Sequence, residues 1–151
     1  MKYAFLLFLF LLITGYVSAQ EKIKLKKKIV PIDVVNAFEE KFLNAKKVKW
    51  FNIEDDVAAS FYSDKHLLTA YYNKKAQWQK TVISIEAIEL APNVIKAHYE
   101  GFYNNWHVNK KEKVETVNAN VYMLEIERDN MIRELIYDES GNLLKEKIIK
   151  Q

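Results

Sequence analysis

Three histidines are the residues of this 151-residue chain that could take part most directly in metal or acid–base chemistry: His66, His98 and His107. A metal site brings several ligands together, usually with closely spaced pairs along the chain. No His-x-x-x-His pair occurs, and no histidine is paired with a carboxylate at such a spacing. We expect His66 in a solvated turn and His107 just before a strand. We expect His98 on the inner side of a helix or at the edge of the helix layer, with a hydrogen-bond partner. The sequence therefore predicts neither a metal site nor a cofactor.

Residues for nucleophilic catalysis are equally scarce. The chain has no cysteine, and no serine beyond residue 19 lies in a Gly-x-Ser-x-Gly turn that would expose a nucleophile. Its three glycines are too few to form a phosphate-binding loop. Two pairs of adjacent carboxylates, Asp55–Asp56 and Glu39–Glu40, fall in a turn or on an exposed helix face, where solvated charge is the ordinary interpretation. We therefore expect a protein that is not an enzyme.

Aromatic side chains are the remaining feature with functional potential, because exposed tyrosines give a large contact area at a low entropic cost. Val57, Ala59 and Phe61 alternate as the apolar side of a strand, and we expect this side to face the helices. If Ala70 and Tyr72 do the same in the next strand, the residues between them point to the open face. The candidate partner-binding residues are therefore Tyr62, Tyr71, Ser60 and Thr69. The alternative is that these side chains only form cross-strand pairs that stabilise the sheet.

The elements that would position these side chains occur twice along the chain. Asn93–Ala97 resembles Asp33–Ala37 at an offset of 60 residues, and Tyr137–Asp138 resembles Tyr72–Asn73 at an offset of 65. Each half reads as a helix followed by strands, with a hairpin turn after the shared tyrosine. The change of offset requires five extra residues in the second half, which we place in a longer first hairpin around residues 110–120.

Alternating apolar and polar residues predict four short strands after each helix. Pro31 and Pro92 stand where the helices begin, because a proline in the first turn loses no hydrogen bond. We therefore predict an α+β fold: a duplicated α-β-β-β-β unit in which one antiparallel sheet of about eight strands carries two helices on one face. The repeats would span residues 31–85 and 92–150 of a single domain, 31–151. The other face of the sheet is left to solvent or to a partner.

The first nineteen residues have the pattern of a secretory signal peptide. Lys2 is followed by the apolar run Phe5–Ile13, and residues 17–19 are small enough for a signal peptidase to read. We expect cleavage after Ala19 and a periplasmic or secreted protein with no stable membrane anchor. The alternative is an uncleaved anchor, because the apolar stretch is at the short limit of a membrane span, about 17–25 residues.

Residues 20–30 form a basic leader ahead of the first helix. Most of its charge lies in Glu21–Lys28, which we interpret as a solvated segment; the alternative is a basic arm that contacts an anionic surface. Ile23 and Leu25 leave room for a short edge strand, whose lysines would discourage pairing with other chains. Over the whole chain the formal charge is only +3 and the signs are mixed, which argues against nucleic acid as a partner.

A further pattern is the order of five segments: Val34–Phe38, Val48–Trp50, Ala70–Asn73, Trp78 and a proline-led second helix. In this order they resemble the PepSY-like, or β-lactamase-inhibitor-protein-like, family of exported bacterial proteins. The resemblance covers roughly residues 31–150 and implies one curved sheet with the helices on one side. The family's Asp-x-x-Gly turn is intact as Asp138–Gly141 but reads Asn73–Ala76 in the first half. The named inhibitors of the family bind their targets through the open sheet face.

These observations lead to two functional hypotheses of different classes. The first is an exported, non-enzymatic binding or inhibitor-like module that engages an unknown extracytoplasmic protein through the open face of the sheet. The alternative is a periplasmic carrier that holds a small apolar or peptide-like ligand between the helices and the sheet. The resemblance carries no catalytic residues to this chain.

Overall fold

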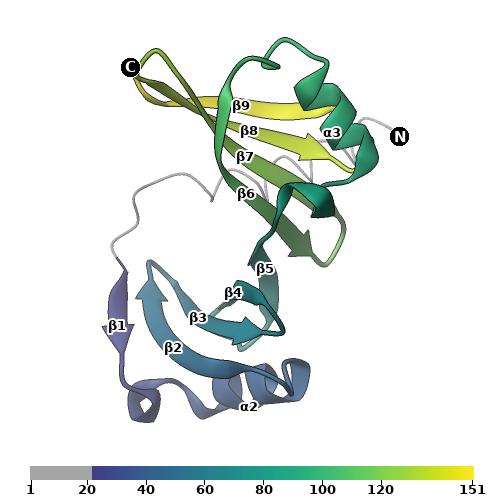
Figure 1. The fold of residues 1–151 in the computed structure, drawn as a ribbon. Coiled ribbons are helices and arrows are strands. Elements are labelled where there is room, and N and C mark those ends of the chain that lie inside the picture. The colour runs from purple at the N-terminus through teal and green to yellow at the C-terminus, as the bar shows by residue number, and fades with distance from the viewer. Residues whose placement is uncertain (1–21) are drawn as a thin grey trace, which may run out of the picture.

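The computed structural model describes residues 22–151 as one antiparallel sheet with two α-helices (Figure 1). The sheet has nine strands, and their order in the sheet is their order in the chain. The strands are β1 (Ile23–Leu25), β2 (Lys46–Ile53), β3 (Asp56–Ser63), β4 (His66–Tyr72), β5 (Trp78–Ser84), β6 (His107–Thr116), β7 (Asn120–Arg128), β8 (Met131–Asp138) and β9 (Leu143–Lys150). The predicted signal peptide, residues 1–19, and its cleavage after Ala19 lie outside the described residues, as do the first two residues of the leader.

Two α-helices and two short 3₁₀-helices complete the described fold. They are α2 (Ile32–Lys41), α3 (Pro92–Tyr99), η2 (Lys27–Ile29) and η3 (Ala87–Glu89). The helix α2 begins directly after Pro31, and Asp33 lies in its first turn, where the positive end of the helix favours a carboxylate. Its buried residues Val34, Val35 and Phe38 recur at helical spacing and form a single apolar face. That face needs a cover, and the sheet provides it.

Both α-helices pack on the same face of a curved sheet. In Figure 1 the sheet bends between its two ends, with α2 outside the end that contains β2 and β3, and α3 outside the end that contains β8 and β9. Residues paired across antiparallel strands point to the same face, and one such row runs from Phe61 through Leu68, Ile83 and Lys113 to Tyr122. Phe61 belongs to the core under α2 and Tyr122 to the core under α3. The predicted α+β fold with both helices on one face is confirmed, with nine strands in place of about eight.

The first repeat packs an aromatic core beneath α2. The Phe38 ring centroid lies 5.1 Å from that of Trp50 and 5.0 Å from that of Phe61, and both contacts are edge-on. Phe42, just past the helix end, lies 4.8 Å from Phe61. Aromatic pairs of this kind contribute about 0.5–1.5 kcal/mol each beyond the burial of their area. These contacts fix α2 against β2 and β3.

The second repeat packs a mainly aliphatic core beneath α3. Leu124, Ile126 and Leu135 have no exposed surface (0%) and cluster with residues of α3 and of the loop that follows it. Phe102 is the repeat equivalent of Phe42, yet it is 85% exposed, and the neighbouring Tyr103 is buried in this core instead. Phe42 and Phe102 therefore align in the sequence, but only Phe42 packs against a core.

The basic leader contains the short edge strand that the sequence left room for, β1. It pairs with β2 over its whole length, with Leu25 opposite Trp50. The leader is thus more than the solvated segment that we favoured, and β1 accounts for the ninth strand. With only three residues and lysines on both sides, it leaves little free edge for another chain to pair with.

The turns of the two repeats have the same hydrogen bonds. The N–H of Asn73 donates to the carbonyl of Gln77 over 3.0 Å, and the Asn73 side-chain oxygen accepts the N–H of Gln77 over 3.0 Å. Asp138 and Asn142 form the equivalent pair of bonds, over 3.0 Å and 2.9 Å. The β6 and β7 strands, with 10 and 9 residues, are longer than β2 and β3, with 8 each. Both observations agree with a duplication whose second copy has a longer first hairpin.

Candidate partner-binding face of the sheet

The face of the sheet opposite the helices, which we call the open face, carries all four predicted partner-binding residues. Phe61 is buried in the core under α2, so its neighbours Ser60 and Tyr62 point to the open face. Ser60 pairs directly with Thr69 on β4, and Tyr71 follows two residues after Thr69 on the same side. The structure therefore confirms the predicted orientation of these side chains. Their role in binding stays a prediction.

Tyr62 is the most accessible of the four residues. It is 45% exposed, and Leu67, directly opposite on β4, is 42% exposed. The Lys47 Nζ lies 5.8 Å from the centroid of the Tyr62 ring, within the range of a cation–π interaction. Two large exposed side chains and a cation thus form a small amphipathic patch at the turn end of the β3–β4 hairpin.

Tyr71 lies at the other end of the same strand pair and is half-buried. The Lys80 Nζ is 4.5 Å from its ring centroid, and the two residues are paired across β4 and β5. Burial raises the pKa of Tyr71 to about 12, and the carboxylates of Glu112 and Asp56 act in the same direction. Burial lowers the pKa of Lys80 to about 8, although Asp56 favours its charged form. At neutral pH Tyr71 is therefore a neutral phenol beside a lysine that is still mostly charged.

An apolar cluster in the second half of the open face is a feature that the sequence analysis missed. Val114, Val121 and Ile136 are only 2–3% exposed. The partly buried residues that pack against them are Val82, Met123 and Leu144. Thr69 pairs with Val82, and Val82 with Val114, so the predicted residues and the cluster lie on one continuous surface. The alternation of residues in β5 could have revealed the cluster. Its use would have required the register between β5 and β6, which belong to different repeats and whose pairing the sequence does not specify.

Charged side chains lie on the open face beside this cluster. Glu112 is buried, and its carboxylate lies 2.8 Å from the Lys110 Nζ. Burial raises the pKa of Glu134, although Lys147 and Lys145 act in the opposite direction. One carboxylate oxygen of Glu134 is buried without a hydrogen-bond partner. Such an oxygen is costly to bury, so a bound molecule that supplied an N–H or O–H group to it would be favoured.

Two of the histidine expectations need correction. His66 is not a solvated turn residue: it begins β4, with Nδ1 3.0 Å from the Ser84 carbonyl oxygen and Nε2 3.2 Å from the Glu89 carboxylate. His98 is fully buried as expected, but neither of its ring nitrogens has the expected hydrogen-bond partner. Burial lowers the pKa of His98 below its ordinary value. His107 begins β6 and is exposed.

The described residues contain no candidate metal-binding site. Between residues 22 and 151, no group of three or more His, Cys, Asp or Glu side chains could hold a metal ion. In that same part of the chain, no helix is long and apolar enough to cross a membrane. What the open face does offer is aromatic, apolar and charged side chains.

Comparison with known proteins identifies the fold. No family model matches the chain, and no curated protein does. A DUF2874 family protein from Bacteroides ovatus superposes with a TM-score of 0.76 at 25% identity, over 79% of this chain and 87% of that chain. A BLIP-like protein from Bacteroides fragilis superposes with a TM-score of 0.75 at 24% identity, over 91% of this chain and 92% of that chain. A Bacteroides eggerthii protein proposed to be periplasmic gives a TM-score of 0.76 at 15% identity, over 79% and 88% of the two chains.

These matches extend over most of both chains, and at these identities the likeness concerns the fold. The predicted resemblance to β-lactamase-inhibitor-protein-like proteins is confirmed for the fold. The predicted membership of a PepSY-like family stays a prediction. The chain is an α+β protein with the fold of the BLIP-like and DUF2874 proteins of Bacteroides.

Proposed function

We propose that this protein is an exported binding module without catalytic activity, and that it engages a protein partner through the open face around Tyr62 and Tyr71. The observation that carries the proposal is the exposed pair Tyr62 and Leu67, on a sheet face opposite both described α-helices. Large exposed side chains that stand next to each other are typical of recognition surfaces, whereas single ones are common on any protein.

The open face combines the kinds of contact that protein interfaces use. Interfaces are enriched in tyrosine and in apolar side chains at their centre and in polar groups at their rim. The residues that could supply these contacts are Tyr62, Leu67 and Tyr71, the polar Ser60 and Thr69, and the cations Lys47 and Lys80. The bend of the sheet in Figure 1 turns its two ends toward each other on this side, so a rounded partner could contact both repeats.

The structural neighbours support the class of this proposal. Similarity to a BLIP-like protein favours binding over catalysis, and similarity to a protein proposed to be periplasmic favours export. The partner is therefore to be sought among extracytoplasmic proteins of the native cell.

The test is site-specific photo-cross-linking in the native cell envelope. A photoreactive phenylalanine analogue replaces Tyr62 in one variant and Glu40, an exposed residue of α2, in the other. We expect a discrete cross-linked product from position 62 and none from position 40. A product from position 40 alone would contradict an open-face interface.

Substitution then measures how much the tyrosines contribute. The double variant Tyr62→Ala/Tyr71→Ala should weaken capture of the cross-linked partner at least about ten-fold, because each interface tyrosine contributes on the order of 1–2 kcal/mol. The matched control is Tyr99→Ala/Phe102→Ala, which removes two aromatics that are 43% and 85% exposed at the end of α3 and beyond it. Equal loss of capture in both variants, or no loss in either, would reject the proposal.

A further inference from the structure

The open face carries different charges in the two repeats. On its first-repeat half, the described residues place one carboxylate, Asp56, and six lysines, which we call the cationic strip: Lys22, Lys24, Lys46, Lys47, Lys49 and Lys80. On its second-repeat half, the register places five carboxylates and four lysines: Glu112, Glu125, Glu127, Glu134, Asp138, Lys110, Lys145, Lys147 and Lys150. The positive charge of this face is therefore concentrated in the first repeat.

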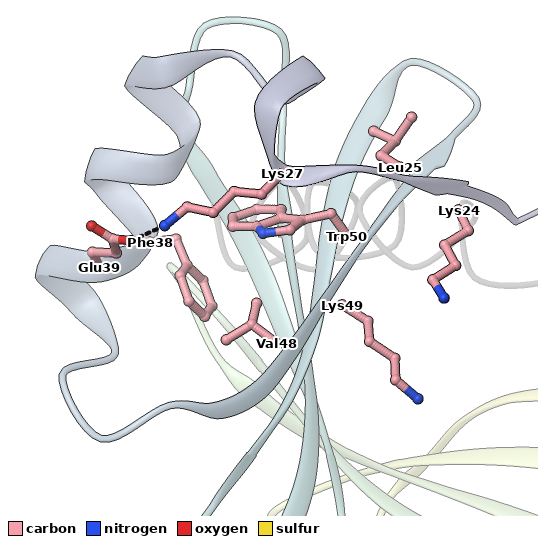
Figure 2. Close-up of a pocket in the computed structure, with 8 residues that line it drawn as sticks. All are labelled: Lys24, Leu25, Lys27, Phe38, Glu39, Val48, Lys49 and Trp50. Atoms are coloured by element: carbon pink, nitrogen blue, oxygen red, sulfur yellow. Dashed lines mark hydrogen bonds and ion pairs between the residues drawn. The ribbon is translucent and has the colours of Figure 1, made fainter.

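The register of the sheet fixes the direction of the central lysines of the cationic strip. Lys49 pairs directly with Ser60, which points to the open face. Phe51 follows Lys49 by two residues on the same side, and Lys24 of the edge strand pairs with it. Figure 2 accordingly shows Lys24 and Lys49 turned away from Trp50. Both lysines therefore belong to the open face.

A pocket of about 300 Å³ lies on the helix side of the same sheet edge (Figure 2). It is found where the register of β2 with β3 shifts between Lys46 and Lys49, and Phe38 and Trp50 form part of its apolar wall. Lys24 and Lys49 border the pocket, but their ammonium groups are turned to the opposite face. The pocket and the cationic strip are therefore separate features.

Three lysines of the cationic strip lie over aromatic rings of the same face. The pairs are Lys22 over Phe51, Lys47 over Tyr62 and Lys80 over Tyr71, with 6.0 Å, 5.8 Å and 4.5 Å between the lysine Nζ and the ring centroid. Contacts of this kind hold a cation beside a flat apolar surface. The strip therefore offers positive charge and apolar area side by side.

Carboxylates balance the lysines of the second repeat but not most of those of the cationic strip. The Lys110 Nζ lies 2.8 Å from the Glu112 carboxylate, and Lys147 pairs with Glu134 across β8 and β9. In the strip, the Asp56 carboxylate favours the charged form of Lys80 alone. The other five lysines of the strip have no ion-pair partner within residues 22–151. A partner that carries carboxylates would supply the counter-charge that the first repeat lacks.

We propose that the cationic strip recognises an acidic segment of a partner protein, with carboxylates between Lys24 and Lys49 and side-chain carbons against Phe51. This inference rests on the proposed open-face function and names the chemistry of its partner. Carboxylates form charge-assisted hydrogen bonds with lysines, and the hydroxyl groups of Ser60 and Thr69 can donate to the same oxygens. Complementary charge would also steer the partner toward the first repeat.

The test uses a hexaglutamate peptide as the probe and nuclear magnetic resonance of the ¹⁵N-labelled exported protein. At about 20 mM salt we expect hexaglutamate to shift the backbone amide signals of Phe51 and Ser60 with a dissociation constant of about 1 mM or below. The uncharged hexaglutamine should bind at least about ten-fold more weakly. About 300 mM salt should weaken the binding of hexaglutamate at least about five-fold, because exposed charges are screened. Absence of these shifts at about 5 mM hexaglutamate, or equal binding of hexaglutamine, would overturn the proposal.

Charge variants separate a site from a general attraction. Lys24→Gln/Lys49→Gln should raise the dissociation constant of hexaglutamate at least about five-fold. The matched control Lys145→Gln/Lys147→Gln removes the same charge from the second-repeat half of the open face, and should change binding less than about two-fold. Equal weakening by both pairs would reduce the effect to bulk charge and reject the site.

Other polyanions test the class of partner. An oligothymidylate of six nucleotides and hexagalacturonate should each bind at Phe51 and Ser60 more weakly than hexaglutamate. Tighter binding of either would overturn the assignment to a protein segment in favour of a nucleic acid or an acidic glycan.

The two proposals for this face fail separately. A cross-linked product from position 62 without binding of hexaglutamate would reject the acidic segment and leave the open-face interface in place. Binding of hexaglutamate at the cationic strip without any cross-linked product would support the acid-binding site and reject the interface around Tyr62.

Discussion

The two repeats share one order of elements but fill their cores with different chemistry. Under α2, Phe38 packs edge-on against Trp50 and Phe61. At the position of Phe38, α3 carries His98, a fully buried ring whose nitrogens have no hydrogen-bond partner, and Ile126 stands at the position of Phe61. Each repeat still buries one helix stripe on four strands. The same order of helix and strands can thus be stabilised by cores of different side chains, provided that the interior is mainly apolar and of suitable volume.

The turns show a second difference between the repeats. Ala76 and Gly141 occupy the same turn position, both with a positive φ, of 59° and 83°. A Cβ atom at Gly141 would lie 2.5 Å from the Asn93 carbonyl oxygen in α3. In the first repeat an alanine is accepted and packs partly against the aromatic core. The glycine of the second repeat is therefore required by the close approach of the helix as well as by the backbone angle.

The largest effect should come from removing the central ring of the aromatic core. Phe38→Ala is expected to lower the free energy of unfolding by about 3–5 kcal/mol, because it deletes a buried ring and leaves a cavity. Denaturant unfolding measures this loss. Ile32→Ala, on the same helix but 68% exposed, should change it by less than about 0.5 kcal/mol. A loss below about 1 kcal/mol for Phe38→Ala would show that the aromatic core does not hold the first repeat.

The next effect should come from the turn of the second repeat. Gly141→Ala is expected to cost about 2–4 kcal/mol, because it adds left-handed strain and a contact with the α3 backbone that must be relieved. The neighbouring exposed substitution Ser140→Ala serves as the control in the same unfolding experiment. If Gly141→Ala cost no more than its control, close approach of α3 would not distinguish the two turns.

Substitution of the buried histidine should increase stability, in contrast to the two substitutions above. His98→Leu, a change of similar volume, is expected to raise the free energy of unfolding by about 1–2 kcal/mol, since it removes two buried polar atoms without partners. His107→Leu, at an exposed residue, controls for the loss of a histidine as such. A destabilised His98→Leu protein would mean that the imidazole contributes to the second core.

The pH dependence of stability gives a related but smaller effect. Burial holds the pKa of folded His98 below its unfolded value of about 6.5, so the unfolded chain takes up the proton first as the pH falls. Stability from neutral His98 is therefore complete above pH 6.5 and is lost progressively below it, down to the folded pKa. The advantage of His98→Leu over wild type should grow by up to about 1 kcal/mol between pH 7.5 and 5.5. A constant difference across this range would refute the assignment, since His66 and His107 are common to both proteins.

The smallest effect should come from the turn of the first repeat. Ala76→Gly is expected to raise the free energy of unfolding by about 0.5 kcal/mol, because relief of the positive φ outweighs the lost methyl contact and the greater freedom of the unfolded chain. Lys75→Gly, at the adjacent residue without a positive φ, should be neutral or destabilising in the same measurement. Destabilisation of Ala76→Gly by more than its control would show that packing, not backbone strain, governs this turn.

Much of the fold could be predicted because it rests on local periodicity. The alternation of Val57, Ala59 and Phe61 correctly placed Tyr62 and Tyr71 on the open face, since successive side chains of a strand must point to opposite sides. The order of helix and strand segments predicted the α+β fold with one antiparallel sheet and two helices. The strand β1 was harder to predict, because three residues among lysines carry little local pattern and pair only when β2 is already in place.

The candidate sites were less accessible to sequence reasoning. The bond between His66 and Glu89 joins residues of different elements, and the apolar cluster of Val114, Val121 and Ile136 depends on how β5 meets β6. The pocket beside Trp50 arises where two strands lose their register, which has no signature in residue type.

The amino-acid sequence by itself determined the order of the two α-helices and of the four strands after each, and the buried side of β3, because backbone geometry imposes periods of 3.6 and 2 on any chain. Only the tertiary structure decided which side chains meet across the two repeats, which polar atoms lack partners, and where the sheet edge opens. Those outcomes depend on strand register and helix approach between segments far apart in the chain, where burial of the whole core selects the arrangement.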